Sequence, residues 1–415
     1  MENKKKTLLE NFISLGALQI VSYVIPLINL PYLSRVLGTD KFGLVFFAFA
    51  FMQYFIMLTD YGFGLSATRE IAVNRHNKNN LSNIFCSVTV IKFILLFVSY
   101  VILCLLTLFV PKLHQNWLIF QLSFLMVVGN AIYPVWFFQG MERMKYITFL
   151  NILAKIIFVG LIFIFVKHES DYIIVPLFNS LGFLISGLIG MYFAIKEFDI
   201  KFYFPKWQSI KKQFKYSSEF FLSRVSVSAY TNTNTFCLGL IGSNIMVGYY
   251  VAAEQIYKAI NGLQGPLGQA LYPFVAKHKD IKTYKKWFNI AILCNIVICS
   301  FVFVFAKQFI TIFYGSNMIE AYKVLRIFCL ISLMVFPSML VGYPLIGATG
   351  HTKEANGSVI IGSIIHLIGL FILFLTNKMN IYSIALMVLI TESIVFGIRV
   401  LAIWKYKLLT IKEKV

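Results

Sequence analysis

Long runs of apolar residues alternate with short polar segments along the whole chain. Most runs reach about 20 residues, the length that an α-helix needs to cross the hydrocarbon core of a bilayer. We expect an all-α integral membrane protein with twelve transmembrane helices. The expected spans are 12–35, 42–66, 84–109, 117–139, 147–166, 172–195, 214–240, 247–274, 287–313, 321–346, 356–376 and 381–404.

Two related turns suggest that the chain is built from two similar halves. LGTDKFG at 37–43 separates the first two spans, and IGSNIMVG at 241–248 separates the seventh and eighth. Gly38 and Gly242 are about half of the 415-residue chain apart. We therefore expect two pseudo-symmetric six-helix lobes. The expected parts are an N-terminal lobe at 1–195, a basic cytoplasmic linker at 196–215, a C-terminal lobe at 214–404 and a basic cytoplasmic tail at 405–415.

The composition and the placement of charge support a membrane protein. Hydrophobic residues make up 59% of the chain and charged residues 13%, against about 25% charged in ordinary soluble domains. The formal net charge of +20 is compatible with nucleic acid as a partner, but 24 of the 37 Lys and Arg lie in segments on one predicted side of the membrane. Positive residues mark the cytoplasmic side. Both termini are therefore expected in the cytoplasm, and no nucleic acid partner is expected.

The sequence lacks the usual signatures of an enzyme. It contains no Walker phosphate loop, no GxSxG elbow and no HExxH motif. The six cysteines have no metal-like spacing, so no metal, cofactor or catalytic residue is predicted. The apolar run at the start extends past Leu30, which is too long for a cleaved signal peptide. A transporter is the expected class.

Several cations lie inside the predicted spans, where charge is costly unless it faces a watery cavity or a carboxylate. They are Lys92, Lys155, Arg224, Lys258, Lys323, Arg326 and Arg399. Lys323 and Arg399 are close to helix ends, and we expect them to extend toward the interface. Lys92, Lys155, Arg224 and Lys258 lie deeper and are the candidates for a functional cavity.

Carboxylates at depth are fewer. Glu254 lies four residues before Lys258, a spacing that favours an ion pair along one helix. Asp60 has two open interpretations: a coupling or gating residue, or a partner of Arg69 or Arg75. His366 also has two: a proton carrier, or a hydrogen-bonded core residue.

Three stretches resemble the Wzx-type flippases of lipid-linked oligosaccharides, in the polysaccharide-transport branch of the MATE-like MOP exporter superfamily. They are RVLGTDKFG with LTDYGFGLSATREIA, then YPVWFFQGMERMKYI at 133–147, then VGYYVAAEQIYKAI with GPLGQALYPFVAK at 247–277. The resemblance covers essentially the whole chain.

The resemblance implies two six-helix lobes around a central cavity in the bacterial cytoplasmic (inner) membrane. It implies transport of an undecaprenyl-diphosphate-linked oligosaccharide, such as an O-antigen repeat unit, from the cytoplasmic to the periplasmic leaflet. A polysaccharide polymerase and a chain-length regulator are implied partners. Cavity cations are expected at Arg224, Lys258, Lys92 and Lys155, and coupling or gating residues at Asp60, Glu254 and Arg69. Candidates for stacking on sugar rings are Tyr133, Trp136, Tyr230 and Tyr249.

Three alternatives remain open. A peptidoglycan-precursor flippase of the same superfamily usually has two further helices. A MATE-type cation-coupled antiporter should favour acidic rather than basic cavities. A membrane polysaccharide polymerase would need an acidic site or a large outer loop, and the predicted outer loops are short.

Overall fold

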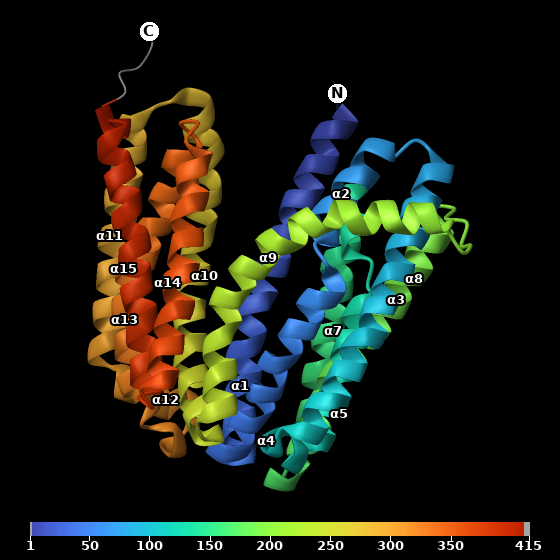
Figure 1. Ribbon diagram of the computed structural model, residues 1–415. Helices are drawn as coiled ribbons and strands as arrows, with labels where there is room; N and C mark the ends of the chain where they lie inside the picture. The colour runs from blue at the N-terminus through green and yellow to red at the C-terminus, as the bar shows by residue number, and fades with distance from the viewer. Residues whose placement is uncertain (1, 411–415) are drawn as a thin grey trace. The chain divides into compact units, whose positions relative to one another are not determined.

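A computed structural model describes the backbone of residues 2–410 (Figure 1). The side chains at 2–21, 23, 24, 27, 222–232, 263, 264 and 410 lie outside the described residues. Every regular element of the described part is a helix, which confirms the predicted all-α class. The chain packs as two units. One comprises Met1–Asn29 and Val36–Ser228, and the other comprises Leu30–Arg35 and Ala229–Val415. We refer to them as unit 1 and unit 2.

Unit 1 is built from long helices joined by short turns. Its elements are α1 (Glu2–Asp60, except for 30–35), α2 (Phe63–Asn74), α3 (Lys78–Phe109), α4 (Pro111–Gln115), α5 (Trp117–Ile132), α6 (Val135–Gly140), α7 (Met144–Phe165), η1 (Glu169–Ile173), α8 (Ile174–Glu197) and the first part of α9 (Trp207–Ile241). One hydrophobic core joins α2, α3, α6 and α7. Phe85 of α3 and Phe137 of α6 lie at its centre with no exposed surface, and their ring centroids are 5.3 Å apart.

Unit 2 contains the rest of α9 and the helices that follow. These are α10 (Asn244–His278), α11 (Ile281–Val304), α12 (Ala306–Tyr314), η2 (Ser316–Met318), α13 (Ala321–Val341), the π-helical η3 (Gly342–Gly347), α14 (Thr352–Leu375), α15 (Ile381–Lys405) and η4 (Leu408–Thr410). Tyr284 of α11 is buried in its core, and its hydroxyl donates to the Leu340 carbonyl of α13 at 3.1 Å. The short stretch of α1 in this unit is held by Ser34, whose hydroxyl donates to the Tyr314 carbonyl at 3.1 Å.

Nine helical segments within the described residues are long and apolar enough to cross a bilayer. They are Ile28–Asn74, Lys78–Phe109, Trp117–Gly140, Met144–Phe165, Glu169–Glu197, Ile281–Val304, Ala321–Gly347, Thr352–Leu375 and Ile381–Lys405. The chain is therefore a multi-pass membrane protein. The count of twelve, the domain limits and the cytoplasmic termini stay predictions.

The two expected turns interrupt the helices in different ways. Within α1 the helical geometry is interrupted at Gly38, which has φ 66° and ψ 174°. Only glycine adopts this combination readily, so the predicted turn is located at this residue. The second turn has a polar cap instead: α9 ends at Ile241, and the Ser243 hydroxyl accepts a hydrogen bond from the Met246 N–H at 3.3 Å to begin α10. Ser and Asn are preferred at this position because they satisfy an otherwise unpaired N–H group.

Candidate functional site

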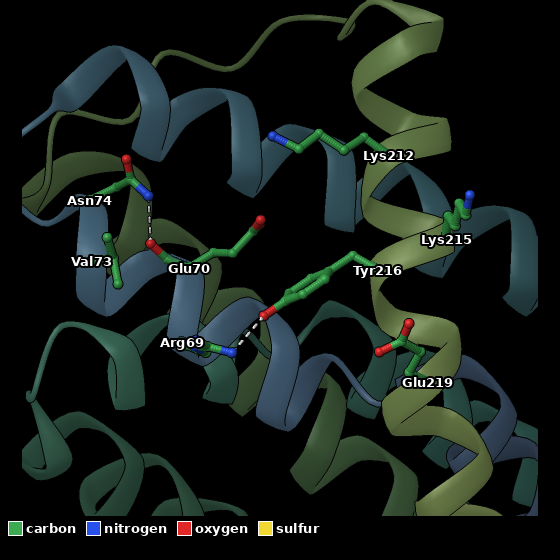
Figure 2. A pocket seen from close by; sticks show the side chains of 8 residues that line it. All are labelled: Arg69, Glu70, Val73, Asn74, Lys212, Lys215, Tyr216 and Glu219. Carbon is green, nitrogen blue, oxygen red and sulfur yellow. Dashed lines mark hydrogen bonds between the residues drawn. The ribbon is translucent and has the colours of Figure 1, made fainter.

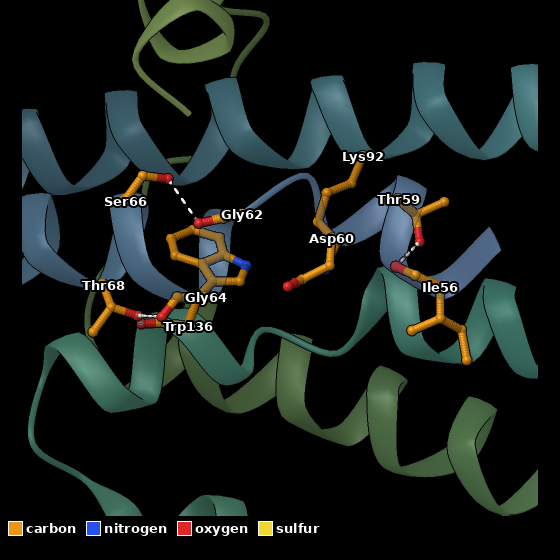
Figure 3. A network of polar contacts seen from close by, with 9 residues as sticks. All are labelled: Ile56, Thr59, Asp60, Gly62, Gly64, Ser66, Thr68, Lys92 and Trp136. Atoms are coloured by element: carbon orange, nitrogen blue, oxygen red, sulfur yellow. Dashed lines mark hydrogen bonds and ion pairs between the residues drawn. The ribbon is translucent and has the colours of Figure 1, made fainter. Parts of the chain in front are cut away.

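The structure brings together Asp60 and Lys92, two residues that the sequence placed in separate groups (Figure 3). Asp60 is the last residue of α1, and Lys92 lies on α3. The Lys92 ammonium is 3.9 Å from the Asp60 carboxylate, and the lysine side chain is 3% exposed. Isolated burial of such a charge would cost several kcal/mol, so the carboxylate is the group that makes this placement of Lys92 tolerable.

The ion pair corrects one interpretation of Asp60. Arg75 bonds elsewhere: its Nε donates to the Gly140 carbonyl at 2.7 Å, and it pairs with Glu142 at 2.8 Å. Arg69 donates to the Tyr216 hydroxyl at 3.3 Å. Neither arginine is the structural partner of Asp60.

A sharp break in the backbone holds Asp60 in position. Tyr61 and Gly62 both have left-handed backbone angles, with φ 42° and 77°. The Tyr61 ring stacks on Phe214 and Phe221, with centroids 4.5 Å and 4.7 Å away. A Cβ atom on Gly62 would lie 2.8 Å from the Phe221 nitrogen. The TDYG sequence therefore forms a rigid joint that fits against the first part of α9.

Beyond the joint, α2 and α9 border an open cavity of about 630 Å³ (Figure 2). Its charged lining consists of Arg69 and Glu70 of α2 and Lys212, Lys215 and Glu219 of α9. The Gln213 amide donates to the Glu70 carboxylate, and the Ser66 and Ser217 hydroxyls are 2.8 Å apart. Arg69, the predicted gating residue, thus lies where α2 meets α9.

The YPVWFFQGMER motif has a packing role in the structure. Trp136 is 3% exposed, and its carbonyl accepts a hydrogen bond from Thr68 at 3.1 Å. The buried Tyr133 hydroxyl donates to the Ile147 carbonyl and accepts from the Asn151 amide, both at 3.1 Å. The Trp136 ring itself packs against Phe85 and Phe137, with centroids 5.6 Å and 6.1 Å away, so both aromatic side chains have partners within unit 1. Their proposed stacking on sugar rings stays a prediction.

The other predicted cations have different surroundings. Lys155 on α7 is partly buried and donates to the Ser22 hydroxyl at 2.8 Å. On α10, Lys258 is 49% exposed and pairs with Glu254, which is 13% exposed, at 2.7 Å. The pairing expected from their spacing is present. Tyr249 is half-buried on the same helix.

Two further candidates, Arg224 and Tyr230, have side chains outside the described residues. Their helix is α9. Their assignment to a cation site and a sugar-stacking site stays a prediction.

Unit 2 contains a buried polar site that we did not predict. Arg399 was expected to extend toward the interface, but it is 8% exposed and turns inward. Its Nε donates to the Ser358 hydroxyl at 3.0 Å and its Nη1 to the Ser338 carbonyl at 2.7 Å. The guanidinium adjoins a cavity of about 230 Å³ that Glu392 also lines. No short motif marks this site, because its parts come from three helices.

His366 is a hydrogen-bonded core residue. It has no exposed surface, one ring nitrogen is 2.9 Å from the Asn234 amide oxygen, and the other is 3.1 Å from the Thr391 hydroxyl. Among the described residues, no group of three or more His, Cys, Asp or Glu is arranged to hold a metal ion.

Comparisons with known proteins agree on a family and a fold. The family model described as "Polysaccharide biosynthesis protein" matches residues 8–279. A protein of Escherichia coli (strain K12) named "Putative O-antigen transporter" is 30% identical over 415 residues, covering 99% of this chain and 100% of that protein. A protein of the same name from Shigella dysenteriae is 26% identical and covers 88% of this chain and 92% of its own.

Solved structures establish the fold more broadly. The lipid II flippase MurJ in an inward closed conformation has a TM-score of 0.72 at 16% identity, covering 95% of this chain and 87% of that one. An inward-facing multidrug resistance MATE transporter of the MOP superfamily has a TM-score of 0.63 at 16% identity, covering 96% and 98%. The fold is thus shared with both kinds of protein. Because the family model matches residues 8–279 and the Escherichia coli relative is 30% identical along 99% of the chain, this chain belongs to the polysaccharide biosynthesis protein family.

Proposed function

We propose that this protein is a flippase for an undecaprenyl-diphosphate-linked oligosaccharide, moving it from the cytoplasmic to the periplasmic leaflet of the bacterial inner membrane. The observation that carries the proposal is the 30% identity, along 99% of the chain, to the Escherichia coli protein named "Putative O-antigen transporter". The other curated relative described above is also named a transporter. The chain is accordingly a transporter rather than an enzyme.

The physical problem in this reaction is the diphosphate. Its prenyl tail remains in lipid, but its negative charges must cross a hydrocarbon layer about 30 Å thick. Lysine and arginine in a wet cavity compensate that charge, and arginine binds a phosphate with two hydrogen bonds. Arg224, Lys258, Lys92 and Lys155 are the proposed cations. Lys258 is supported best, since its side chain is 49% exposed while Lys92 is 3% exposed and paired with Asp60.

Transport is proposed to follow alternating access between two six-helix lobes with cytoplasmic termini. Asp60, Glu254 and Arg69 are the proposed coupling or gating residues. Asp60 directly precedes the joint at Tyr61 and Gly62, and Arg69 lies farther along α2, where it donates to the Tyr216 hydroxyl of α9. Delivery of the glycan to a polysaccharide polymerase and a chain-length regulator is part of the same proposal.

Purified protein in liposomes tests this proposal. A fluorescent oligosaccharide on undecaprenyl diphosphate is placed in one leaflet, and its movement is followed by a quencher that does not cross the membrane. We expect protein-dependent translocation without growth of the sugar chain, and a loss of rate in Lys258→Gln. Lys323→Gln is the matched control, since Lys323 pairs with Glu320 at 2.7 Å near the start of α13.

Three outcomes would overturn the proposal. Growth of polymer would indicate a polymerase. Translocation of lipid II but not of the oligosaccharide would indicate a peptidoglycan-precursor flippase. Cation-driven export of drugs without lipid movement would indicate a MATE-type antiporter.

A further inference from the structure

A basic and aromatic segment joins α8 to α9. It runs from Lys201 to Lys215 with the sequence KFYFPKWQSIKKQFK, and we call it the 201–215 segment. It contains five lysines, and no aspartate or glutamate occurs from Ile200 to Ser218. Such a concentration of lysine next to bulky aromatic residues is typical of surfaces that contact acidic lipid.

The first residues of this segment are fixed against α3. The Lys201 N–H donates to the Ser82 hydroxyl at 3.0 Å. The Tyr203 N–H donates to the Cys86 sulfur at 3.4 Å, and the Cys86 thiol donates to the Lys201 carbonyl at 3.6 Å. Ser82 and Cys86 are one helical turn apart, so they hold an extended strip of backbone along one face of α3. These hydrogen bonds to α3 fix the backbone and therefore the outward direction of the aromatic side chains.

These aromatic side chains are left uncovered by the protein. Phe202 is 59% exposed, Phe204 82% and Trp207 69%. Contact with water would be unfavourable for this much apolar surface, and a contiguous exposed patch usually marks an interaction site. Tryptophan is enriched where bilayer and water meet, because its ring is apolar and its N–H is polar.

The start of α9 continues the same surface. Ile210, Gln213 and Ser217 are buried and define the face that packs on unit 1. Lys211, Lys212 and Lys215 are exposed. The basic side of the helix therefore faces away from the core of unit 1, and Lys212 and Lys215 on that side line the open cavity beside α2.

The position along α3 places this surface at headgroup depth. With 32 residues and a rise of about 1.5 Å per residue, α3 is roughly 48 Å long, while the hydrocarbon core is about 30 Å thick. Its first residues, Lys78–Asn83, are largely polar. Ser82 and Cys86 lie at the change from polar to apolar sequence, which is the level of the lipid phosphates.

A cavity of about 610 Å³ adjoins the fixed strip. Its polar lining consists of Lys78, Asn79, Ser82, Lys196, Asp199 and Lys201. Asp199 pairs with Lys78 at 2.5 Å, so Lys196 and Lys201 leave an excess of positive charge. The lining combines this charge with hydroxyl and amide groups, which suits a phosphate diester.

We propose that the 201–215 segment is a binding site for acidic phospholipid. The headgroup phosphate binds in the cavity between Lys196 and Lys201, and Phe202, Phe204 and Trp207 enter the interface beside it. Lys206 and Lys211, which are exposed and do not line the cavity between α2 and α9, extend the contact to neighbouring headgroups. This inference uses the membrane location of the chain and is independent of what the protein transports.

Fluorescence of Trp207 tests the depth of the segment. Wild type and Trp207→Phe are reconstituted in nanodiscs with brominated phosphatidylglycerol or brominated phosphatidylcholine, and the difference between their spectra reports Trp207 alone. We expect this difference signal to be quenched by brominated lipid, more strongly with phosphatidylglycerol, and to be protected from aqueous acrylamide. A signal that acrylamide quenches and brominated lipid does not would overturn the proposal, and would point to a soluble partner for this surface.

Lipid retention tests the charge. The variant Lys196→Gln, Lys201→Gln, Lys206→Gln and Lys211→Gln is compared with a matched control in another basic stretch, Lys277→Gln, Lys279→Gln, Lys282→Gln and Lys285→Gln. Delipidated protein is titrated with phosphatidylglycerol, phosphatidylcholine or undecaprenyl diphosphate. We expect phosphatidylglycerol binding about fivefold weaker per lysine removed in the first variant and little changed in the control. Equal losses in both variants would refute a specific site, as would a loss confined to undecaprenyl diphosphate.

Discussion

Two lysine–carboxylate pairs within the predicted spans are arranged in opposite ways. Lys258 and Glu254 are one turn apart on α10, with charged atoms 2.7 Å apart and the lysine 49% exposed. Lys92 and Asp60 come from two helices, are 3.9 Å apart, and the lysine is 3% exposed. The first pair is formed within one helix and its lysine is exposed, and we call it the open pair. The second pair is formed by packing between two helices and its lysine is buried, and we call it the closed pair.

The difference separates two roles that the same residue types can have. A buried charge whose carboxylate partner is removed destabilises the protein strongly, because the remaining charge has no compensation. An open pair contributes little to folding, but its ammonium group is accessible to an anion. We therefore propose that Lys92, although it is one of the four candidate cations, mainly stabilises unit 1, and that Lys258 mainly binds the substrate.

The largest effect is expected from Asp60→Asn. The substitution leaves Lys92 buried beside a neutral amide and should lower the free energy of unfolding by about 3 kcal/mol. The Tm of the purified protein measures it. Glu320→Gln is the control, since both members of its pair with Lys323 are 46% exposed. If the two variants melt at the same temperature, the closed pair contributes no more to stability than the exposed Glu320–Lys323 pair. A loss of transport in Asp60→Asn would then indicate a coupling role for Asp60.

The next largest effect is expected from Gly62→Ala, which tests whether the joint maintains the closed pair. Its φ of 77° and the 2.8 Å approach to the Phe221 nitrogen should together cost about 1–3 kcal/mol. Gly160→Ala is the control, because nothing lies within 4 Å of a Cβ atom there. The Tm of each variant reports the difference, and a tolerated Gly62→Ala would show that the joint adapts.

For the open pair, Lys258→Gln should separate stability from transport. Loss of an exposed pair costs about 0.5 kcal/mol, so the Tm should hardly move. Loss of one charged hydrogen bond to the diphosphate corresponds to a roughly tenfold slower translocation. An unchanged rate in the liposome assay would remove Lys258 from the proposed site.

The smallest effect concerns a pair outside the spans. Lys78 beside Asp199 holds the pKa of that carboxyl below its usual value. A pKa that is lower in the folded state gives stability above the pKa of the unfolded chain, about 3.9, and this stability is lost as the pH falls through the folded value. Lys78→Gln should therefore remove a small stabilisation at pH 7 and none in strong acid. A difference in Tm between wild type and Lys78→Gln that does not shrink as the pH falls from 7 into strong acid would contradict this pairing.

Much of the architecture was predictable because it depends on local rules. Apolar runs of membrane length indicate helices wherever they fold, and the related turns LGTDKFG and IGSNIMVG indicate breaks between them. The Glu254–Lys258 pair was also readable, since helix geometry alone brings positions four apart together.

The sequence alone thus determined the helical membrane class, the turns near Gly38 and Gly242, and the contacts between near neighbours in the chain. The breaks at Tyr61–Gly62 and at Tyr133–Pro134 fall inside the predicted spans 42–66 and 117–139 and emerged only from the structure. Tertiary structure decided which charges meet across helices. It paired Lys92 with Asp60 rather than leaving Asp60 to Arg69 or Arg75, and it turned Arg399 inward onto Ser338 and Ser358. The reason is physical: the cost of a buried charge depends on which oxygen atoms surround it, and packing brings those atoms from distant parts of the chain.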